Sequence, residues 1–286
     1  MKIDKIIFSS SEEYSVFWNL QSEAWNSMGI TPVLLLFGKK KNTDIDGRFG
    51  TILEMEYSSD AIKSLQLTWS KVHHTHTEPD TTWIIGDIDL LPLQKDWFTK
   101  EIEEISEEYY AHLACTHLGS WHTTDKIDLP AYYHVAKGRI FNKVYKLDTM
   151  TLVDYVNFII STHKYGRNIT DEYKKMTVKQ IADSVGKLKI NHAMEPFWCA
   201  DENYSSHILK NACLNGEVNW AGKTFDVVDW QNPYNSKRID RHFWNSPNYD
   251  MVDMTRLRMR KYIDIHCTAP FPFEAQKDCL NDIMQM

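Results

Sequence analysis

Segments typical of strands alternate with segments typical of helices in the first third of the chain, and this alternation constrains the fold more than any other feature. Short apolar runs that favour strands lie at 2–10, 31–38, 51–57 and 81–91. Two segments between them, 11–30 and 58–76, carry apolar residues at helical spacing. Strands separated by helices are joined by crossover connections, which make them parallel. We therefore predict an α/β fold built from βαβ units, with a mainly parallel central sheet flanked by helices.

The pattern of predicted helices and strands changes near the middle of the chain. Residues 96–118 are predicted to form a helix and a strand, and 131–145 another strand or hairpin edge. Beyond them the segments 151–166, 177–188 and 200–216 are helical in pattern, and the last quarter is rich in loops and aromatic residues. A chain of 286 residues suits one domain with two lobes. We expect two halves within that domain, 1–145 and a helical, loop-rich 146–286.

Two aspartates follow an apolar run in "TTWIIGDIDLLPL", Thr81–Leu93. Asp87 and Asp89 are one residue apart, and in an extended segment such side chains point to the same side. Two adjacent carboxylates repel each other unless water or a cation relieves them, so the pair can converge on one hard divalent cation. Two solvated aspartates in a turn are the alternative. The apolar run before them and the close approach that Gly86 allows favour a cation site.

Two serines occupy the matching position after the first strand. Ser9 and Ser10 follow the apolar run at 2–10, as Asp87 follows the run at 81–91. Ligands of open α/β sheets bind beyond the carboxyl ends of the strands. We therefore expect these serines and the aspartates to share one edge of the sheet.

Charge and cysteine content narrow the class of protein. The net charge is −7, with 32 basic and 39 acidic residues, which argues against bulk nucleic-acid binding but leaves room for a local basic pocket. The five cysteines are odd in number and never spaced C-x-x-C, so we expect reduced thiols and a cytoplasmic location. No apolar run approaches the roughly 18–20 residues of a membrane span, and the first residues lack the apolar core of a signal peptide.

The "DID" at the end of an apolar strand, after a Rossmann-like first half, resembles the GT-A class of nucleotide-sugar glycosyltransferases. In that class the D-x-D motif binds Mn²⁺ or Mg²⁺ and the sugar nucleotide. The resemblance covers 1–145 by architecture and implies a hexosyl- or pentosyltransferase. It further implies a UDP-sugar as the expected donor and a glycan or another hydroxyl compound as acceptor. Asp87 and Asp89 would hold the metal, Asp87 would also reach the ribose or donor sugar, and Ser9 and Ser10 would border the nucleoside.

A second match lies near the other end of the chain, in "KYIDIHCTAPFPF". Many enzymes of this class supply a third metal ligand from a histidine near the C-terminus, and His266 has that position. In one retaining branch a Gly and Lys-Pro-Trp follow this histidine. Here "TAPFPF" follows it instead, so the sequence does not assign that branch. A buried structural histidine is the alternative for His266.

The third match, "EPFWCADENYSSHIL", resembles the acceptor segment of the class. An inverting enzyme needs a carboxylate there as general base for the acceptor hydroxyl. Asp201 or Glu202 would serve, with Trp198 as a platform for the sugar. The alternative is structural: Asp201 caps a helix and Glu202 favours its dipole from the first turn. Both inversion and retention stay open.

Two competing functions follow from other features. In "HHTHTEPD", His74 and His76 resemble the H-x-H of binuclear metallohydrolases, but the usual Asp-His pair does not follow. We interpret these histidines as the end of a helix, where the dipole favours positive charge. The 13% aromatic content would also suit a non-catalytic carbohydrate-binding protein whose second half is the binding surface.

Overall fold

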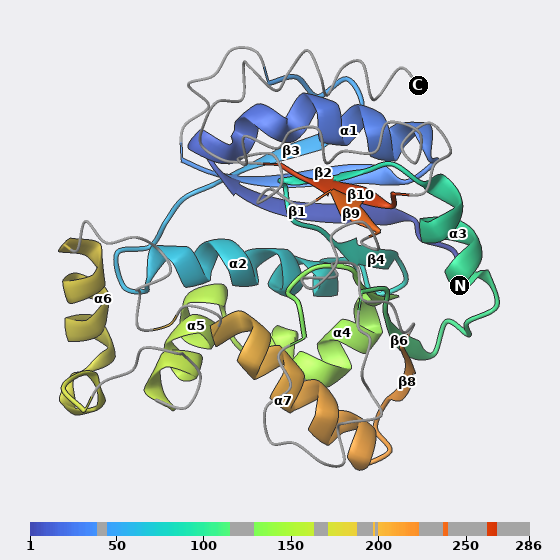
Figure 1. Cartoon of the computed structure of the whole chain (residues 1–286). Helices are drawn as coiled ribbons and strands as arrows, with labels where there is room; N and C mark the ends of the chain where they lie inside the picture. Colours follow the sequence, from blue (N-terminus) through green and yellow to red (C-terminus); the bar gives the residue numbers. More distant parts are fainter. Residues whose placement is uncertain are drawn as a thin grey trace.

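The computed structural model describes residues 1–38, 45–114, 129–162, 171–187, 197, 200–222, 237–239 and 262–267. Within them the predicted alternation builds a seven-stranded sheet in the order β3-β2-β1-β4-β7-β6-β8 (Figure 1). Its strands are β1 (Lys5–Ser11), β2 (Thr31–Phe37), β3 (Thr51–Met55), β4 (Thr82–Ile85), β6 (Tyr109–His112), β7 (His134–Lys137) and β8 (Asn219–Gly222).

The strands run mainly in one direction. β1 pairs in parallel with β2 and β4, β2 with β3, and β6 with β8. β7 is antiparallel to both of its neighbours, β4 and β6. The predicted fold class, α/β with a mainly parallel central sheet flanked by helices, is confirmed by this arrangement.

Helices cover both faces of the sheet. Successive side chains of a strand point to opposite faces, so the hydrophobic core consists of two clusters, one on each face. Ile6 and Phe8 of β1 pack in the cluster that holds the tryptophans of α1 and α3, whereas Ile7 packs in the cluster that holds Trp69 of α2. Burial on both faces explains why "TPVLLLF" in β2 is almost free of polar residues. The helices are α1 (Trp18–Ser27), α2 (Lys63–His74), α3 (Lys95–Glu103), α4 (Gly138–Tyr145), α5 (Leu152–Ser161), α6 (Val178–Lys187) and α7 (Ala200–Leu214).

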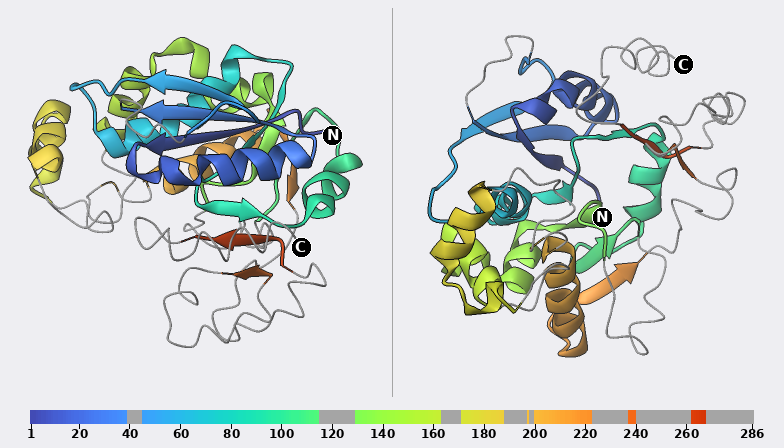
Figure 2. Two further views of the ribbon diagram at one scale, coloured as in Figure 1. Left: turned by 90° about the horizontal axis from the view of Figure 1, so that it is seen from above. Right: turned by 60° about the vertical axis from the view of Figure 1, so that its left-hand side comes forward.

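Short 3-10 helices join several of these elements: η1 (Glu13–Phe17), η2 (Thr75–Thr77), η4 (Leu147–Thr149) and η5 (Tyr173–Lys175). Figure 2 shows α6 at the periphery, next to α5. Within the described ranges, none of the helices combines the length and the apolarity that crossing a membrane requires.

The prediction for 131–145 was wrong in its second part. Only His134–Lys137 is a strand, and α4 begins directly after it at Gly138. Ile140, Phe141, Val144 and Tyr145 are buried, and their spacing is that of one helix face. Packing of this face against the α2 side of the sheet therefore decides in favour of a helix where the aromatic and β-branched residues favoured a strand.

A second, three-stranded sheet joins distant parts of the chain. It has the order β5-β10-β9, from β5 (Leu90–Pro92), β10 (Asp264–His266) and β9 (Arg238–Ile239). In Figure 2 the red β10 lies apart from the blue strands of the main sheet. β5 begins one residue after Asp89, and β10 pairs with it in antiparallel fashion, with His266 opposite Leu90.

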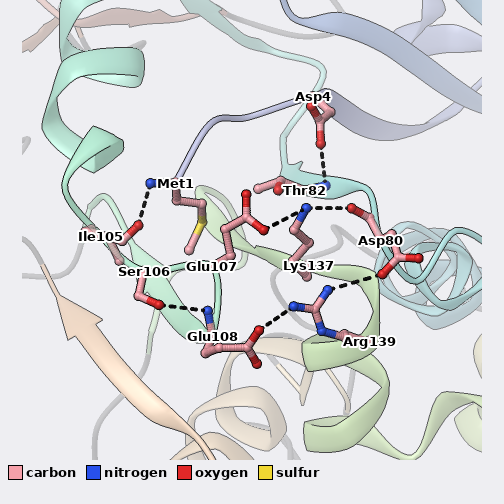
Figure 3. A network of polar contacts seen from close by, with 10 residues as sticks. All are labelled: Met1, Asp4, Asp80, Thr82, Ile105, Ser106, Glu107, Glu108, Lys137 and Arg139. Carbon is pink, nitrogen blue, oxygen red and sulfur yellow. Dashed lines mark hydrogen bonds and ion pairs between the residues drawn. The ribbon is translucent and has the colours of Figure 1, made fainter.

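Ion pairs link neighbouring segments at the edge of the main sheet where β4 begins (Figure 3). Lys137 donates to the Asp80 carbonyl at 2.7 Å and lies 3.2 Å from the Glu107 carboxylate. Arg139 pairs with the Asp80 carboxylate at 3.3 Å and with Glu108 at 2.5 Å. These cations are thus engaged by neighbouring acids at the edge opposite to Asp87, as a structural role requires.

Gly86 is required by the close packing of β4 on β1. A β-carbon at this position would lie 2.5 Å from Cε1 of Phe8 and 2.8 Å from Cδ1 of Ile6. We expect Gly86→Ala to lower the free energy of unfolding by about 1–3 kcal/mol, as overpacking does. Urea denaturation measures this, with Gly47→Ala as the control, because its nearest neighbour would lie at an ordinary 3.4 Å. Equal stability of the two variants would contradict the packing described here.

Candidate functional site

The main sheet places the two predicted groups at one edge. Ile7 of β1 is level with Ile85 of β4, and the Gly86 amide donates to the Ile7 carbonyl at 2.9 Å. Because the two strands are parallel, Ser9 and Asp87, each two residues further on, both follow at the carboxyl edge. Ser9 is half-buried, and Ser10 is buried and donates to the Ser11 carbonyl at 2.8 Å. That the serines border a nucleoside stays a prediction.

The aspartate pair does not lie in an extended segment, so the premise from which we expected both side chains to point to the same side was wrong. The extended backbone ends at Ile85, and residues 88 and 89 form a turn in which the Leu90 amide donates to the Asp87 carbonyl at 3.0 Å. The turn is needed because β4 belongs to the main sheet and β5 to the small one. The carboxylates of Asp87 and Asp89 consequently meet different partners.

Asp89 meets His266. Its Oδ2 lies 3.5 Å from Nε2 of the histidine, and the two side chains are only 16% and 18% exposed. The pairing of β10 with β5 holds them together, and the Cys267 amide donates to the Asp89 carbonyl at 2.7 Å. The structure therefore brings His266 next to Asp89; that the two share a metal ion stays a prediction.

Asp87 meets Lys71 of α2. The lysine Nζ contacts Oδ1 of Asp87 and donates to the Gly86 carbonyl at 3.2 Å. Its side chain is 5% exposed, against 34% for that of Asp87. Sequence reasoning missed Lys71. The hint was a lysine between Trp69 and Val72, two residues that pack in the core, because a charge within the packed part of a helix needs a partner.

Asp89 and His266 fit a divalent cation. Cis ligands of an octahedral ion with bonds of 2.0–2.2 Å lie about 3 Å apart, so a small inward movement from 3.5 Å would suffice. A carboxylate oxygen suits Mn²⁺ and Mg²⁺, and an imidazole nitrogen suits Mn²⁺ better than Mg²⁺. Over the described part of the chain, three or more His, Cys, Asp or Glu side chains do not gather in one potential metal group. Asp87 as a further ligand, and metal binding itself, stay predictions.

A buried ion pair fixes β10 two residues before His266. Arg238 donates to both carboxylate oxygens of Asp264, from Nε at 2.7 Å and from Nη2 at 2.6 Å. Tyr133 donates to the same carboxylate at 2.7 Å, and Arg238 also donates to the Tyr132 hydroxyl at 2.9 Å. Burial alone would lower the pKa of Arg238, but the Asp264 carboxylate outweighs it and raises that pKa. The pair was not predicted, although an aspartate inside the apolar "YIDIH" indicated a buried partner.

Both predicted catalytic acids lie in the first turn of α7. Burial raises the pKa of Asp201; the charge of Asp87 adds to this rise, and the ammonium of Lys71 opposes it. Asp201 and Lys71 both line a small pocket together with Ser205. The fold therefore brings Asp201 towards the aspartates. Its position in a first turn agrees equally with the structural alternative.

Trp198 lies outside the described residues, so its predicted role as a sugar platform stays a prediction. The carbonyl of Glu202 accepts a hydrogen bond from the Ser206 hydroxyl at 2.7 Å, an ordinary contact within α7.

The histidines of "HHTH" end a helix, as we interpreted them. His73 and His74 form the last turn of α2, and His76 lies in η2. Nε2 of His73 lies 3.0 Å from the Met150 carbonyl, and the ring of His74 packs edge-on against Trp83. Burial lowers the pKa of both His73 and His74. The described residues around them supply no group of three metal ligands.

The Arg238–Asp264 pair should be worth far more than a surface ion pair. Arg238→Met leaves a fully buried carboxylate without its cation, so we expect a loss of about 3–5 kcal/mol in the free energy of unfolding. Arg139→Met removes a pair whose side chains are 37% and 63% exposed, and should cost only about 0–1 kcal/mol. Chemical denaturation of both variants measures the difference. Similar losses of unfolding free energy in the two variants would show that the buried pair does not stabilise β10.

No family model and no curated protein sequence matches this chain. Among solved structures, an active-site mutant of LgtC is similar with 12% identity, a TM-score of 0.45, and coverage of 98% of this chain and 95% of that one. The galactosyltransferase LgtC with donor and acceptor sugar analogs has 12% identity, a TM-score of 0.43, and coverage of 98% and 94%. The apo-form glycosyltransferase GlyE of Streptococcus pneumoniae TIGR4 has 12% identity, a TM-score of 0.31, and coverage of 78% and 66%. We draw no functional conclusion from likenesses of this strength.

Proposed function

We propose that this protein is a metal-dependent glycosyltransferase that moves a sugar from a nucleotide-sugar donor to an acceptor hydroxyl, with a glycan as the expected acceptor. One observation carries the proposal: the His266 imidazole meets the Asp89 carboxylate at the carboxyl edge of a mainly parallel sheet. Ligands bind at that edge in open α/β folds. A carboxylate and an imidazole from opposite ends of the chain, both largely buried, form a donor pair suited to a divalent cation.

In this proposal Asp89 and His266 hold Mn²⁺, or Mg²⁺, and Asp87 is the further ligand or reaches the ribose or donor sugar. The ion would neutralise the charge that develops on the diphosphate leaving group. Ser9 and Ser10, at the end of the neighbouring β1, would border the nucleoside of a UDP-sugar.

The two halves of the chain then divide the work. Residues 1–145 supply β1, β4 and the aspartates for the nucleotide sugar, and 146–286 supply the acceptor side. The halves are interleaved, because β8 joins the main sheet and β10 pairs with β5. Asp201 is the better candidate for the general base, since it lines the same small pocket as Lys71, the partner of Asp87.

The cytoplasm remains the compartment that we propose. Its support is that the two cysteines in the described ranges, Cys213 and Cys267, both carry free thiols.

The metal assignment predicts that Asp89→Asn weakens Mn²⁺ binding by more than the roughly 10–100-fold typical of changes to outer-shell partners. A donor panel of UDP-, GDP-, CMP- and dTDP-sugars should first be screened with Mn²⁺ by thermal stabilisation, since a ligand at one hundred times its Kd adds about 2.7 kcal/mol. Calorimetry with the selected donor then compares wild type, Asp89→Asn and the control Asp96→Asn, whose side chain is 59% exposed.

If the donor binds with equal affinity in the presence of EDTA, the metal assignment is wrong.

The double variant His74→Ala, His76→Ala distinguishes a glycosyltransferase from the competing metallohydrolase. We expect it to retain turnover, because His74 is the last residue of α2 and packs on Trp83, and His76 lies in the following η2. If it loses its metal while Asp89→Asn keeps it, the metallohydrolase interpretation is correct. If none of these proteins binds metal, a carbohydrate-binding protein becomes the better proposal.

Asp201→Asn should slow transfer by roughly 10²–10⁴-fold with donor affinity unchanged, because it removes only the basicity of the side chain. Glu202→Gln is the matched control one residue away. Since the folded protein raises the pKa of Asp201 above 3.8, the carboxylate that acts as base is lost as the pH falls through that raised value. The wild-type rate should therefore rise with pH over an acidic limb that Asp201→Asn lacks. Equal, mild effects of both variants would favour a retaining mechanism, which product anomericity by NMR would decide.

A further inference from the structure

Lys71 holds the first aspartate of the D-x-D segment. Its ammonium contacts Oδ1 of Asp87 and reaches the carbonyl of Gly86 at 3.2 Å. The lysine is nearly enclosed, whereas Asp87 keeps 34% of its side chain exposed. The carboxylate is therefore open to a ligand from solvent on one side and neutralised by the protein on the other.

One carboxylate cannot fully neutralise two cations. A divalent ion that moved from Asp89 and His266 onto Asp87 would approach the ammonium of Lys71 at close range. Like charges repel strongly at such a distance at the effective dielectric constant of a protein surface, and a divalent ion doubles the repulsion of a monovalent one. Either the ion stays away from Asp87, or the lysine must let the carboxylate go.

A lysine released from Asp87 needs another anionic partner, because an unpaired buried ammonium is costly. Lys71 lines a small pocket, and the other residues of that pocket lie near its side chain. Trp69, Tyr110 and Tyr145 form apolar walls, and His134 also lines the pocket. Burial, together with the nearby groups His112 and Lys71, keeps the pKa of His134 low, so its imidazole is neutral and cannot serve as the anionic partner. Asp201 is the acidic group in this lining.

We propose that Lys71 is an internal counter-ion that competes with the divalent metal for Asp87. This inference rests on the proposed function, because it takes Asp89 and His266 as the metal pair. With Lys71 in place, the metal alone is held by two protein ligands and binds weakly. When Lys71 turns towards Asp201 or towards the phosphates of an arriving donor, Asp87 becomes the third ligand. Metal and donor then bind cooperatively, since each removes a cost of binding the other.

The test is the affinity for Mn²⁺ alone, measured by the electron paramagnetic resonance of free Mn²⁺ during titration of the metal-free protein. Lys71→Met removes the ammonium at nearly constant volume, and Lys71→Gln also retains a donor for the Gly86 carbonyl. Circular dichroism checks that each variant is folded, so that one suffices if the other is not. The control is Lys5→Met, because Lys5 is also paired with an acid, Glu78 at 2.7 Å, and is the first residue of β1, at the end of the strand away from Ser9.

We expect both Lys71 variants to bind Mn²⁺ roughly 10- to 100-fold more tightly than wild type, the range by which outer-shell partners change metal affinity. Lys5→Met should match wild type. Adding Asp87→Asn to Lys71→Met should abolish the gain, which shows that it arises at Asp87.

Unchanged or weaker Mn²⁺ affinity in the folded Lys71 variants would overturn the inference. If Asp89→Asn still abolishes binding in that case, the proposed metal pair stands and only the role of Lys71 falls. If Asp89→Asn has no effect in any background, the metal pair is wrong, and the inference falls with it. A gain that survives Asp87→Asn would assign Lys71 to general electrostatic repulsion rather than to competition for this carboxylate.

Discussion

The pairing of β10 with β5 is the contact on which the candidate site depends. It joins a strand near the end of the chain to the segment that directly follows the two aspartates, and so it places His266 beside Asp89. Three-residue strands supply few hydrogen bonds, so this pairing needs support from elsewhere. The Arg238–Asp264 pair provides it, since two charges that are almost fully excluded from water hold β9 and β10 in one register. Together with the two tyrosine hydroxyls, the ion pair satisfies the buried polar groups that would otherwise destabilise the small sheet.

In the candidate site, each aspartate of the motif meets a basic side chain: Asp87 meets Lys71 before the turn at residues 88 and 89, and Asp89 meets His266. Ile85, the last residue of β4, packs on the α2 side of the sheet, and Asp87 contacts Lys71 of α2. Asp89 lies in the turn, where β10 brings the imidazole. The first aspartate is thus neutralised by a lysine, and the second lies beside an imidazole. This asymmetry supports our proposal that the two residues of the motif have different roles.

Gly86 and the turn that follows it explain why the edge can be so crowded. The absent side chain lets β4 end against Phe8 and Ile6, and the chain then leaves the main sheet within a few residues. A larger residue would push the turn away from β1, and Ser9 and Asp87 would no longer share one edge. The backbone at Gly86 thus helps to position the Ser9 and Asp87 side chains at the same edge.

The sequence by itself determined the fold class, because the spacing of apolar residues is set by the local periods of helix and strand. It also located Asp87, Asp89, His266 and Asp201 as candidates, since charged residues beside apolar runs stand out without any coordinates. It did not determine that 138–145 is a helix, because buried aromatic and β-branched residues suit either element until their packing partner is known. Only the tertiary structure decided which side chains meet. Lys71 with Asp87, and Arg238 with Asp264, are contacts between residues far apart in the chain, and their attraction depends on distance and burial, which sequence spacing does not encode.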